Sequence, residues 1–203
     1  MGISIGDRLI GTEYPPFLIA EMSGNHNQSI SHAMKIVEAA AGSGAHAIKL
    51  QTYTADTITL NHRGSSFEIN DKNSLWKGKN LYDLYKDAHT PWEWHAPIIK
   101  RANELGLICF SSPFDESAVD FLETLNVPAY KIASFENCHL PLIHKAASTG
   151  KPLIISTGMA TLGELDSAIK TAKSAGCNEI ILLKCTSTYP ANPENTNLKT
   201  IPN

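Results

Sequence analysis

The sequence predicts an α/β fold: a (β/α)8 TIM-type barrel that is truncated after about six βα units. Short apolar runs alternate along the chain with segments of helical period. The runs are nearly continuous in their apolar character, which is typical of parallel strands buried on both faces. Polar residues follow most runs, and a barrel brings the ends of all its strands to one mouth. We therefore expect residues 1–203 to form one barrel domain, incomplete by its last two units.

Six apolar runs are the expected strands. In chain order they are FLIAEMSGNH (17–26), HAIKLQTY (46–53), LICFSSPF (107–114), PAYKIASFE (128–136), PLIISTGM (152–159) and EIILLKCTS (179–187). A doubly wound open sheet is the competing architecture. It usually carries a glycine-rich first turn, and the first run is followed by no G-x-G-x-x-G pattern. The closed barrel is therefore favoured.

Amphipathic segments of helical period separate these runs. They cover residues 29–43, 91–105, 116–125, 140–148 and 162–175. Thr90 and Thr161 are each followed three residues later by glutamate, so both are expected to open their helices as capping boxes.

One long stretch, residues 53–89, lacks a clear period and is polar with embedded aromatic residues. Loops of this length in compact domains are usually functional. We expect it to cover a substrate, and an ordered surface insertion is the alternative.

Composition excludes several classes of protein. The chain is 42% apolar and 18% charged, which suits a globular domain with a continuous core. Its 20 acidic and 17 basic residues form no long run of one sign, so a nucleic-acid or anionic-membrane surface is not expected. No signal peptide or membrane span is recognisable, and a cytoplasmic protein acting on small molecules is expected.

The four cysteines, Cys109, Cys138, Cys177 and Cys185, lack metal-ligand spacing. We expect them to be reduced thiols packed in the fold. The histidines show no i, i+4 metal spacing either, so the pattern of the chain predicts no metal site.

Polar residues at the expected strand ends form the candidate site. Lys49 and Lys131 stand between apolar neighbours in their strands, where an unpaired ammonium costs several kcal/mol. If the strands are parallel, these lysines, Lys184 and a row of hydroxyls face one cavity, which by composition is a phosphate or carboxylate site. The alternatives are that Ser112 and Thr157 cap the next helices and that Lys184 extends into solvent.

Seven segments resemble, in order, the N-terminal barrel of the sialic acid synthase family. They are AEMSGNHNQS, AIKLQTYTADTITL, LYDLYKDAHTPWEWH, LICFSSPFDESAVDFLE, VPAYKIASFE, GKPLIISTGMATLGEL and LLKCTSTYPANPENTNLKTIP. The SFE, LLKCTS and TPWEWH variants are most similar to its pseudaminic acid branch, and the N-acetylneuraminate and legionaminate branches are the alternatives.

This resemblance implies a reaction. Phosphoenolpyruvate condenses with an N-acetylated amino sugar aldehyde, of the 2,4-diacetamido-2,4,6-trideoxy-altrose type in the pseudaminic branch. The products are a nine-carbon 2-keto acid, here pseudaminic acid, and phosphate. The reaction is metal-dependent, with manganese or magnesium as the implied divalent cofactor.

The resemblance also implies roles for individual residues. Glu21, Lys49 and Lys131 are the implied catalytic residues, with Glu21 near the reacting carbons. The implied phosphoenolpyruvate contacts are Lys49, Ser112, Lys131, Ser134 and Ser156, and the implied sugar contacts are Asn25, Gln51, Glu136, Thr186 and Tyr189.

In the family, the metal ligands and a following antifreeze-like domain lie beyond the segments present here. We therefore expect no metal ligand in this chain, an inactive fragment, and a homodimer for the full-length protein.

Two readings compete with the synthase. A Schiff-base aldolase on the same fold would use Lys131 or Lys49 as a nucleophile with a depressed pKa, and borohydride would then trap a carbonyl substrate on the protein. A non-catalytic phosphosugar-binding module is the second alternative.

Overall fold

The computed structural model describes residues 2–72, 74–188 and 191–201, and the chain forms two compact units. Phe17–Leu125 form one, called here the 17–125 unit. Met1–Pro16 and Asn126–Asn203 form the other, the 126–203 unit.

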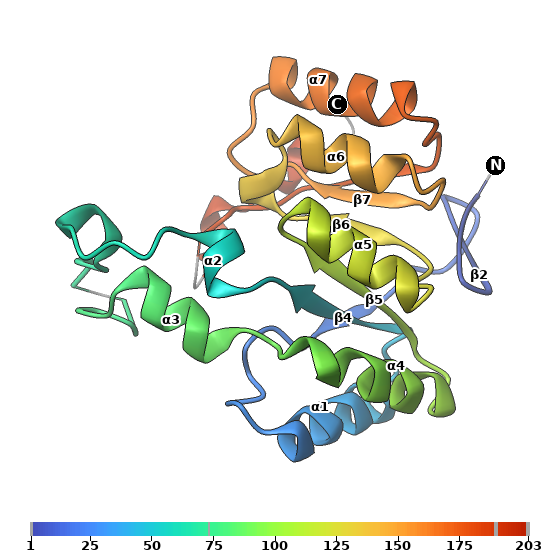
Figure 1. Cartoon of the computed structure of the whole chain (residues 1–203). Helices are drawn as coiled ribbons and strands as arrows, with labels where there is room; N and C mark the ends of the chain where they lie inside the picture. The colour runs from blue at the N-terminus through green and yellow to red at the C-terminus, as the bar shows by residue number, and fades with distance from the viewer. Residues whose placement is uncertain (1, 73, 189–190, 202–203) are drawn as a thin grey trace. The chain divides into compact units, whose positions relative to one another are not determined.

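The 17–125 unit is built on three parallel strands with β4 (Ala47–Thr52) in the centre, between β3 (Ile19–Glu21) and β5 (Ile108–Pro113). Helices α1 (Ile30–Gly42) and α4 (His95–Glu104) lie side by side along one face of β4 (Figure 1). Ile48 and Leu50 are buried in the core that these helices form. Because side chains alternate along a strand, Lys49 and Gln51 face away from α1 and α4.

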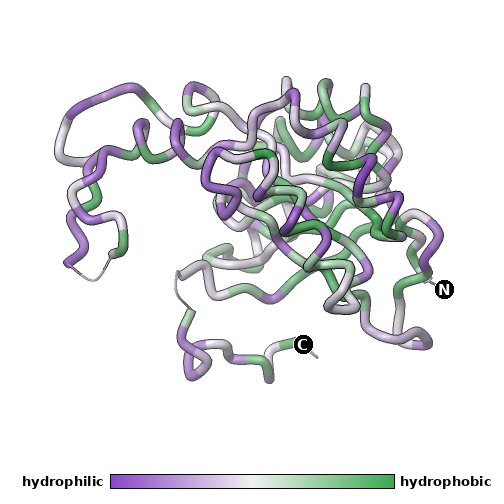
Figure 2. The backbone as a smooth tube through the Cα atoms, turned by 90° about the horizontal axis from the view of Figure 1, so that it is seen from below, coloured by the Kyte–Doolittle hydropathy of each residue, from purple (hydrophilic) through white to green (hydrophobic). Residues whose placement is uncertain are grey.

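The insertion, residues 53–89, contains regular structure that the sequence analysis did not predict. It holds α2 (Ala55–Ile58), the 3-10 turn η1 (Ser65–Phe67) and α3 (Leu81–Ala88). Helix α3 buries none of its residues fully, although Leu81, Leu84, Tyr85 and Ala88 recur at helical spacing and give it a short apolar stripe. Asn80 caps it by accepting the Tyr82 N–H at 3.0 Å. In Figure 2 the insertion runs out as an arm of mostly hydrophilic residues.

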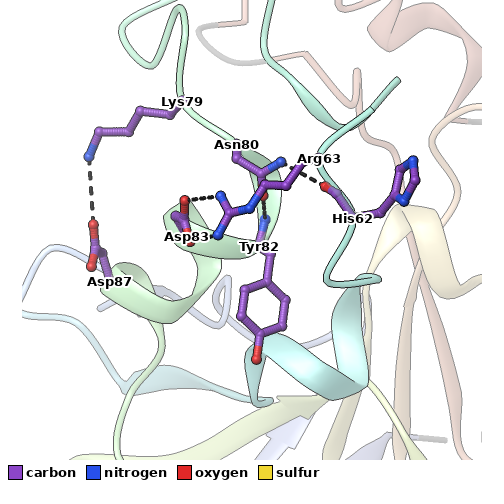
Figure 3. A network of polar contacts seen from close by, with 7 residues as sticks. All are labelled: His62, Arg63, Lys79, Asn80, Tyr82, Asp83 and Asp87. Atoms are coloured by element: carbon purple, nitrogen blue, oxygen red, sulfur yellow. Dashed lines mark hydrogen bonds and ion pairs between the residues drawn. The ribbon is translucent and has the colours of Figure 1, made fainter. Parts of the chain in front are cut away.

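Polar contacts tie the tip of the insertion to α3 (Figure 3). The Arg63 guanidinium makes a bidentate pair with the Asp83 carboxylate, and the Lys79 ammonium lies 3.7 Å from Asp87. The Asn80 amide also donates to the His62 carbonyl at 2.8 Å. Both ion pairs are exposed, so they orient the tip more than they stabilise the fold.

The 126–203 unit has a second set of three parallel strands, with β7 (Leu153–Ser156) between β6 (Tyr130–Ile132) and β8 (Ile180–Leu183). Helices α6 (Leu140–Ala147) and α7 (Leu162–Ser174) pack against each other beside β7 (Figure 1). An antiparallel hairpin of β1 (Ile3–Ile5) and β2 (Arg8–Ile10), absent from the sequence analysis, belongs to this unit. The short turns η3 (Ser134–Glu136), η4 (Pro193–Asn195) and η5 (Leu198–Thr200) complete it.

All six expected strands and five expected helices are confirmed, including α5 (Glu116–Thr124). The Thr161 capping box is confirmed on both sides, with Glu164 reaching back to Thr161. The Thr90 box is wrong. That segment begins with the 3-10 turn η2 (Trp92–Trp94), which has no side-chain cap, because the buried Thr90 hydroxyl is bonded to His26 instead.

The four cysteines are free, as expected. Cys109 and Cys177 are buried, whereas Cys138 is exposed, so the expectation of packed thiols is wrong for Cys138. Among the described residues, no helix combines the length and apolar character that crossing a membrane requires.

Candidate functional site

Lys49 is the buried cation of the 17–125 unit. It is only 5% exposed and follows apolar Ile48 on β4, as the strand pattern predicted. Its ammonium lies 3.4 Å from the Glu21 carboxylate at the end of β3, because the register places Glu21 opposite Lys49. It also donates to the Ser112 hydroxyl at 3.5 Å. The structure therefore brings together three residues that the sequence analysis had chosen separately.

Only one partner of the Lys49–Glu21 ion pair, the lysine, is shielded from solvent. At 3.4 Å and an effective dielectric constant of about 20, the attraction is about 5 kcal/mol before desolvation is subtracted. The Glu21 side chain is 56% exposed, which leaves its carboxylate accessible from solvent. Lys49 thus has a partner that a more strongly charged ligand can displace.

Two neighbouring serines on β5 have different surroundings. Ser112 is on the face of Lys49, whereas the Ser111 hydroxyl lies 2.6 Å from Thr52 on the face of the helices. Thr52 in turn lies 2.9 Å from Nε2 of the buried His95. Burial lowers the pKa of His95 to about 4, so this network is neutral. Ser112 is therefore the candidate for ligand binding and Ser111 is structural; Asp115, not Ser112, caps α5.

Asn25 and Gln51 complete the predicted residues of this unit. Gln51 is partly buried, two residues beyond Lys49 and on the same face of β4. Asn25 is exposed in the β3 loop, defined here as residues 22–29, which follows Glu21 directly. Gln51 thus lies near the end of β4, and Asn25 lies beyond the end of β3.

Lys131 is the buried cation of the 126–203 unit, 7% exposed on β6. Its ammonium donates to the Ser156 hydroxyl at the end of β7 and to the Ile132 carbonyl at 3.2 Å. The Cys185 thiol donates to the same Ser156 oxygen at 3.1 Å. Lys131 and Ser156 therefore meet as predicted, and Cys185 joins them.

Gly158 marks a crowded point that the sequence analysis missed. A Cβ at this position would lie 1.9 Å from the Ser187 hydroxyl and 2.8 Å from the Ser134 hydroxyl. The Ser187 oxygen is buried without a hydrogen-bond partner. Buried polar atoms are rarely left unpaired, so Ser187 is a candidate ligand contact beside the predicted Ser134.

Asn137 holds this crowded turn in place. Its buried amide donates to the carbonyls of Ser156 and Gly158, at 3.1 Å each. Ser187 ends the expected strand run 179–187 and was among its strand-end hydroxyls, whereas no sequence motif marks Asn137. Their role arises from the tertiary approach of the β7 end to η3 and to the segment after β8.

Glu136 has an unusual environment for a carboxyl. Burial raises its pKa to about 7, while the nearby Lys131 ammonium partly offsets that rise. Its Oε2 atom is buried with no hydrogen-bond partner. This carboxyl is thus poised to exchange a proton near neutral pH and has an acceptor atom to offer.

The remaining predicted residues follow β8. Thr186 is partly buried between Cys185 and Ser187, and Tyr189 lies outside the described residues. The Lys184 ammonium donates to the Cys185 carbonyl at 2.9 Å, and the Thr157 hydroxyl donates to the Leu183 carbonyl at 3.1 Å. The alternative that Thr157 caps a helix is therefore wrong.

The described residues contain no group of three or more histidine, cysteine, aspartate or glutamate side chains placed to hold a metal ion. This part of the chain therefore offers no fitted ligand set for the divalent ion that the resemblance implies.

The comparisons with known proteins decide the family. The sequence model of the NeuB family matches residues 36–203. The chain belongs to the NeuB family. Pseudaminic acid synthase of Helicobacter pylori is 48% identical over 91% of the chain. N,N'-diacetyllegionaminic acid synthase of Legionella pneumophila is 39% identical over 93% of it. The chain spans 54% of the length of each of these relatives.

A solved structure supports the fold. N-acetylneuraminic acid synthetase from Leptospira borgpetersenii, crystallised with citrate, matches all of this chain with a TM-score of 0.84 and 29% identity, and 65% of that protein is covered. The predicted barrel fold, truncated after six βα units, is therefore confirmed for this NeuB chain, and the open-sheet alternative is wrong.

Proposed function

We propose that the gene product carrying this NeuB chain condenses phosphoenolpyruvate with an N-acetylated amino sugar aldehyde, giving a nine-carbon 2-keto acid and phosphate. One observation carries the proposal: each unit holds a buried lysine beside a strand-end serine, Lys49 with Ser112 and Lys131 with Ser156. Ammonium and hydroxyl donors of this kind suit phosphate and carboxylate groups.

We assign the binding of phosphoenolpyruvate to Lys49, Ser112, Lys131, Ser134 and Ser156. The lysines neutralise its negative charges, and their strand positions keep them oriented without the substrate, which lowers the cost of reorganisation during the reaction. Glu21 holds the Lys49 ammonium while the substrate is absent.

We assign sugar binding to Asn25, Gln51, Glu136, Thr186 and Tyr189. Amide and hydroxyl groups suit sugar hydroxyls because they can both donate and accept hydrogen bonds, and an ionised carboxyl accepts them. With its pKa near 7, Glu136 is suited to accept or return a proton at a hydroxyl of the sugar.

We propose a 2,4-diacetamido-2,4,6-trideoxy-altrose as the acceptor and pseudaminic acid as the product. The support is the higher identity to the pseudaminic acid synthase, 48%, than to the legionaminic acid synthase, 39%. We further propose a cytoplasmic homodimer that requires manganese or magnesium.

The test is phosphate release by the gene product supplied with phosphoenolpyruvate, manganese and, separately, the altrose-type sugar, N-acetylmannosamine and the legionaminate precursor. We expect release with the altrose-type sugar at the highest kcat/KM, and a product with the mass of the condensed acid. No release with any of the three would overturn the proposal.

Borohydride added during turnover tests the Schiff-base aldolase, and we expect no covalent adduct on Lys131 or Lys49. Tight phosphosugar binding without turnover would instead indicate a binding module.

A further inference from the structure

Several contacts connect the β3 loop to residues 87–94, where the chain leaves the insertion, and this set of contacts is called here the joint. None of the predicted roles explains it. Gln28 lies in the loop, and its side-chain amide donates to two backbone carbonyls of the other segment, Asp87 at 2.9 Å and His89 at 2.7 Å. These carbonyls lie at the C-terminal end of α3, where a helix leaves carbonyls without partners. One side chain of the loop thus caps the last helix of the insertion.

A second contact between the two segments is made by a buried histidine. His26 is fully buried, and its Nδ1 accepts the backbone N–H of Gln28 at 3.2 Å. Because Nδ1 accepts, the ring proton is on Nε2, which donates to the buried Thr90 hydroxyl at 3.1 Å. The His26 and Trp94 rings also meet edge to face, with centroids 5.5 Å apart. His26 therefore links the loop to the segment immediately after the insertion.

The two segments also touch through their backbones. A Cβ at Gly24 would lie 3.0 Å from the Ala88 carbonyl oxygen and 3.2 Å from the Ala88 Cβ. Three other residues of the loop adopt left-handed backbone angles, with φ of 49° at Ser23, 50° at Asn27 and 52° at Gln28. Such angles are costly outside glycine and persist only where surrounding contacts hold them. The joint supplies these contacts.

The start of the insertion, near Tyr53, is also bonded to the segments at its end. The Trp92 indole donates to the Tyr53 carbonyl at 3.3 Å, and the Tyr82 hydroxyl on α3 donates to Asp56 on α2 at 2.9 Å. The base of the insertion is thus fixed on both sides, whereas its tip is held through exposed ion pairs and the Asn80 amide (Figure 3).

We propose that Gln28 and His26 are positioning residues that make the β3 loop and the base of the insertion one rigid piece, so that α3 sets the position of Asn25. That Asn25 meets the sugar rests on the proposed function, whereas the joint does not. The acceptor site and the insertion then respond together to any change at the joint.

Hydrogen exchange on the chain tests the joint directly. Gln28→Met keeps the length and backbone preference of the side chain but removes the amide donor. We expect amide exchange to accelerate about tenfold in both residues 22–29 and residues 85–90. The matched control is Asn70→Ala, whose amide also bridges two carbonyls, Ser65 and Glu68, but within the tip. We expect it to accelerate exchange only near residues 65–70.

Kinetics of the gene product test the positioning role. We expect Gln28→Met to raise KM for the sugar severalfold while KM for phosphoenolpyruvate stays unchanged. Acceleration confined to residues 85–90 would show that Gln28 only caps α3 and would overturn the proposal, as would an unchanged KM for the sugar. If no sugar supports turnover, the proposed function fails, and the exchange experiment still decides whether the joint exists.

Discussion

Glu136 gives the sharpest quantitative prediction. Its pKa rises from the ordinary 4.5 to about 7 in the folded chain because burial disfavours the charged carboxylate. At about 1.36 kcal/mol per pKa unit, a rise of about 2.5 units corresponds to about 3 kcal/mol. The folded chain binds the Glu136 proton more tightly than the unfolded chain does. The protonated carboxyl therefore contributes its full stabilisation below pH 4.5, and this contribution is lost as the pH rises to 7.

Glu136→Gln removes this titration. We expect the variant and the wild-type chain to change in relative stability by about 3 kcal/mol between pH 4 and pH 8, with the variant gaining at the higher pH. Urea unfolding at both pH values measures the difference. Glu164→Gln is the control of opposite sign, because its capping contacts lower the pKa of Glu164 and stabilise the charged form. If Glu136→Gln changes the free energy of unfolding by the same amount at both pH values, the raised pKa of Glu136 is refuted.

Three further predictions concern other residues of the two units. Lys131→Met should weaken phosphoenolpyruvate binding by the gene product about 10- to 100-fold, measured by calorimetry, because a charge-assisted hydrogen bond is worth about 1.5–3 kcal/mol. The melting temperature should not fall. Unchanged affinity would contradict the role assigned to Lys131. Folding lowers the pKa of His95 from 6.5 to about 4. Its neutral form therefore contributes about 3 kcal/mol to the free energy of unfolding above pH 6.5, and this contribution is lost as the pH falls to 4. His95→Asn should abolish this part of the pH dependence in urea unfolding. Gly158→Ala should destabilise the chain by about 1–3 kcal/mol, because its Cβ would meet Ser187 at 1.9 Å. Gly163→Ala, where a Cβ meets nothing within 4 Å, should be neutral or stabilising in the same thermal melts.

The sequence predicted the repeating elements because their signals are local. An apolar run flanked by polar residues needs no distant partner to be recognised as a strand, and the helical period is equally self-contained. The Thr161 capping box was found for the same reason, since both of its residues lie in one turn. Helix α3 was missed although Leu81, Leu84, Tyr85 and Ala88 recur at helical spacing, because this stripe covers only eight residues inside a polar stretch without a clear period.

The site was predicted most directly where a residue contradicts its surroundings. Lys49 and Lys131 stood out as charges in apolar strands, and both are buried next to serines that the sequence analysis had chosen. Ser187 was one of the strand-end hydroxyls but was given no role of its own, and Asn137 gave no signal in the sequence. Their importance depends on Gly158 approaching from another segment, which no local pattern encodes.

By itself, the sequence determined the order and type of the six parallel strands and of five helices, and the family to which the chain belongs, because composition and period act over a few residues. Only the tertiary structure decided which hydroxyl faces a lysine and which faces a helix, that Thr90 bonds to His26 rather than capping its own helix, and that Glu136 titrates near neutral pH. Those outcomes depend on strand register, burial and the approach of distant segments, which arise only when the chain is folded.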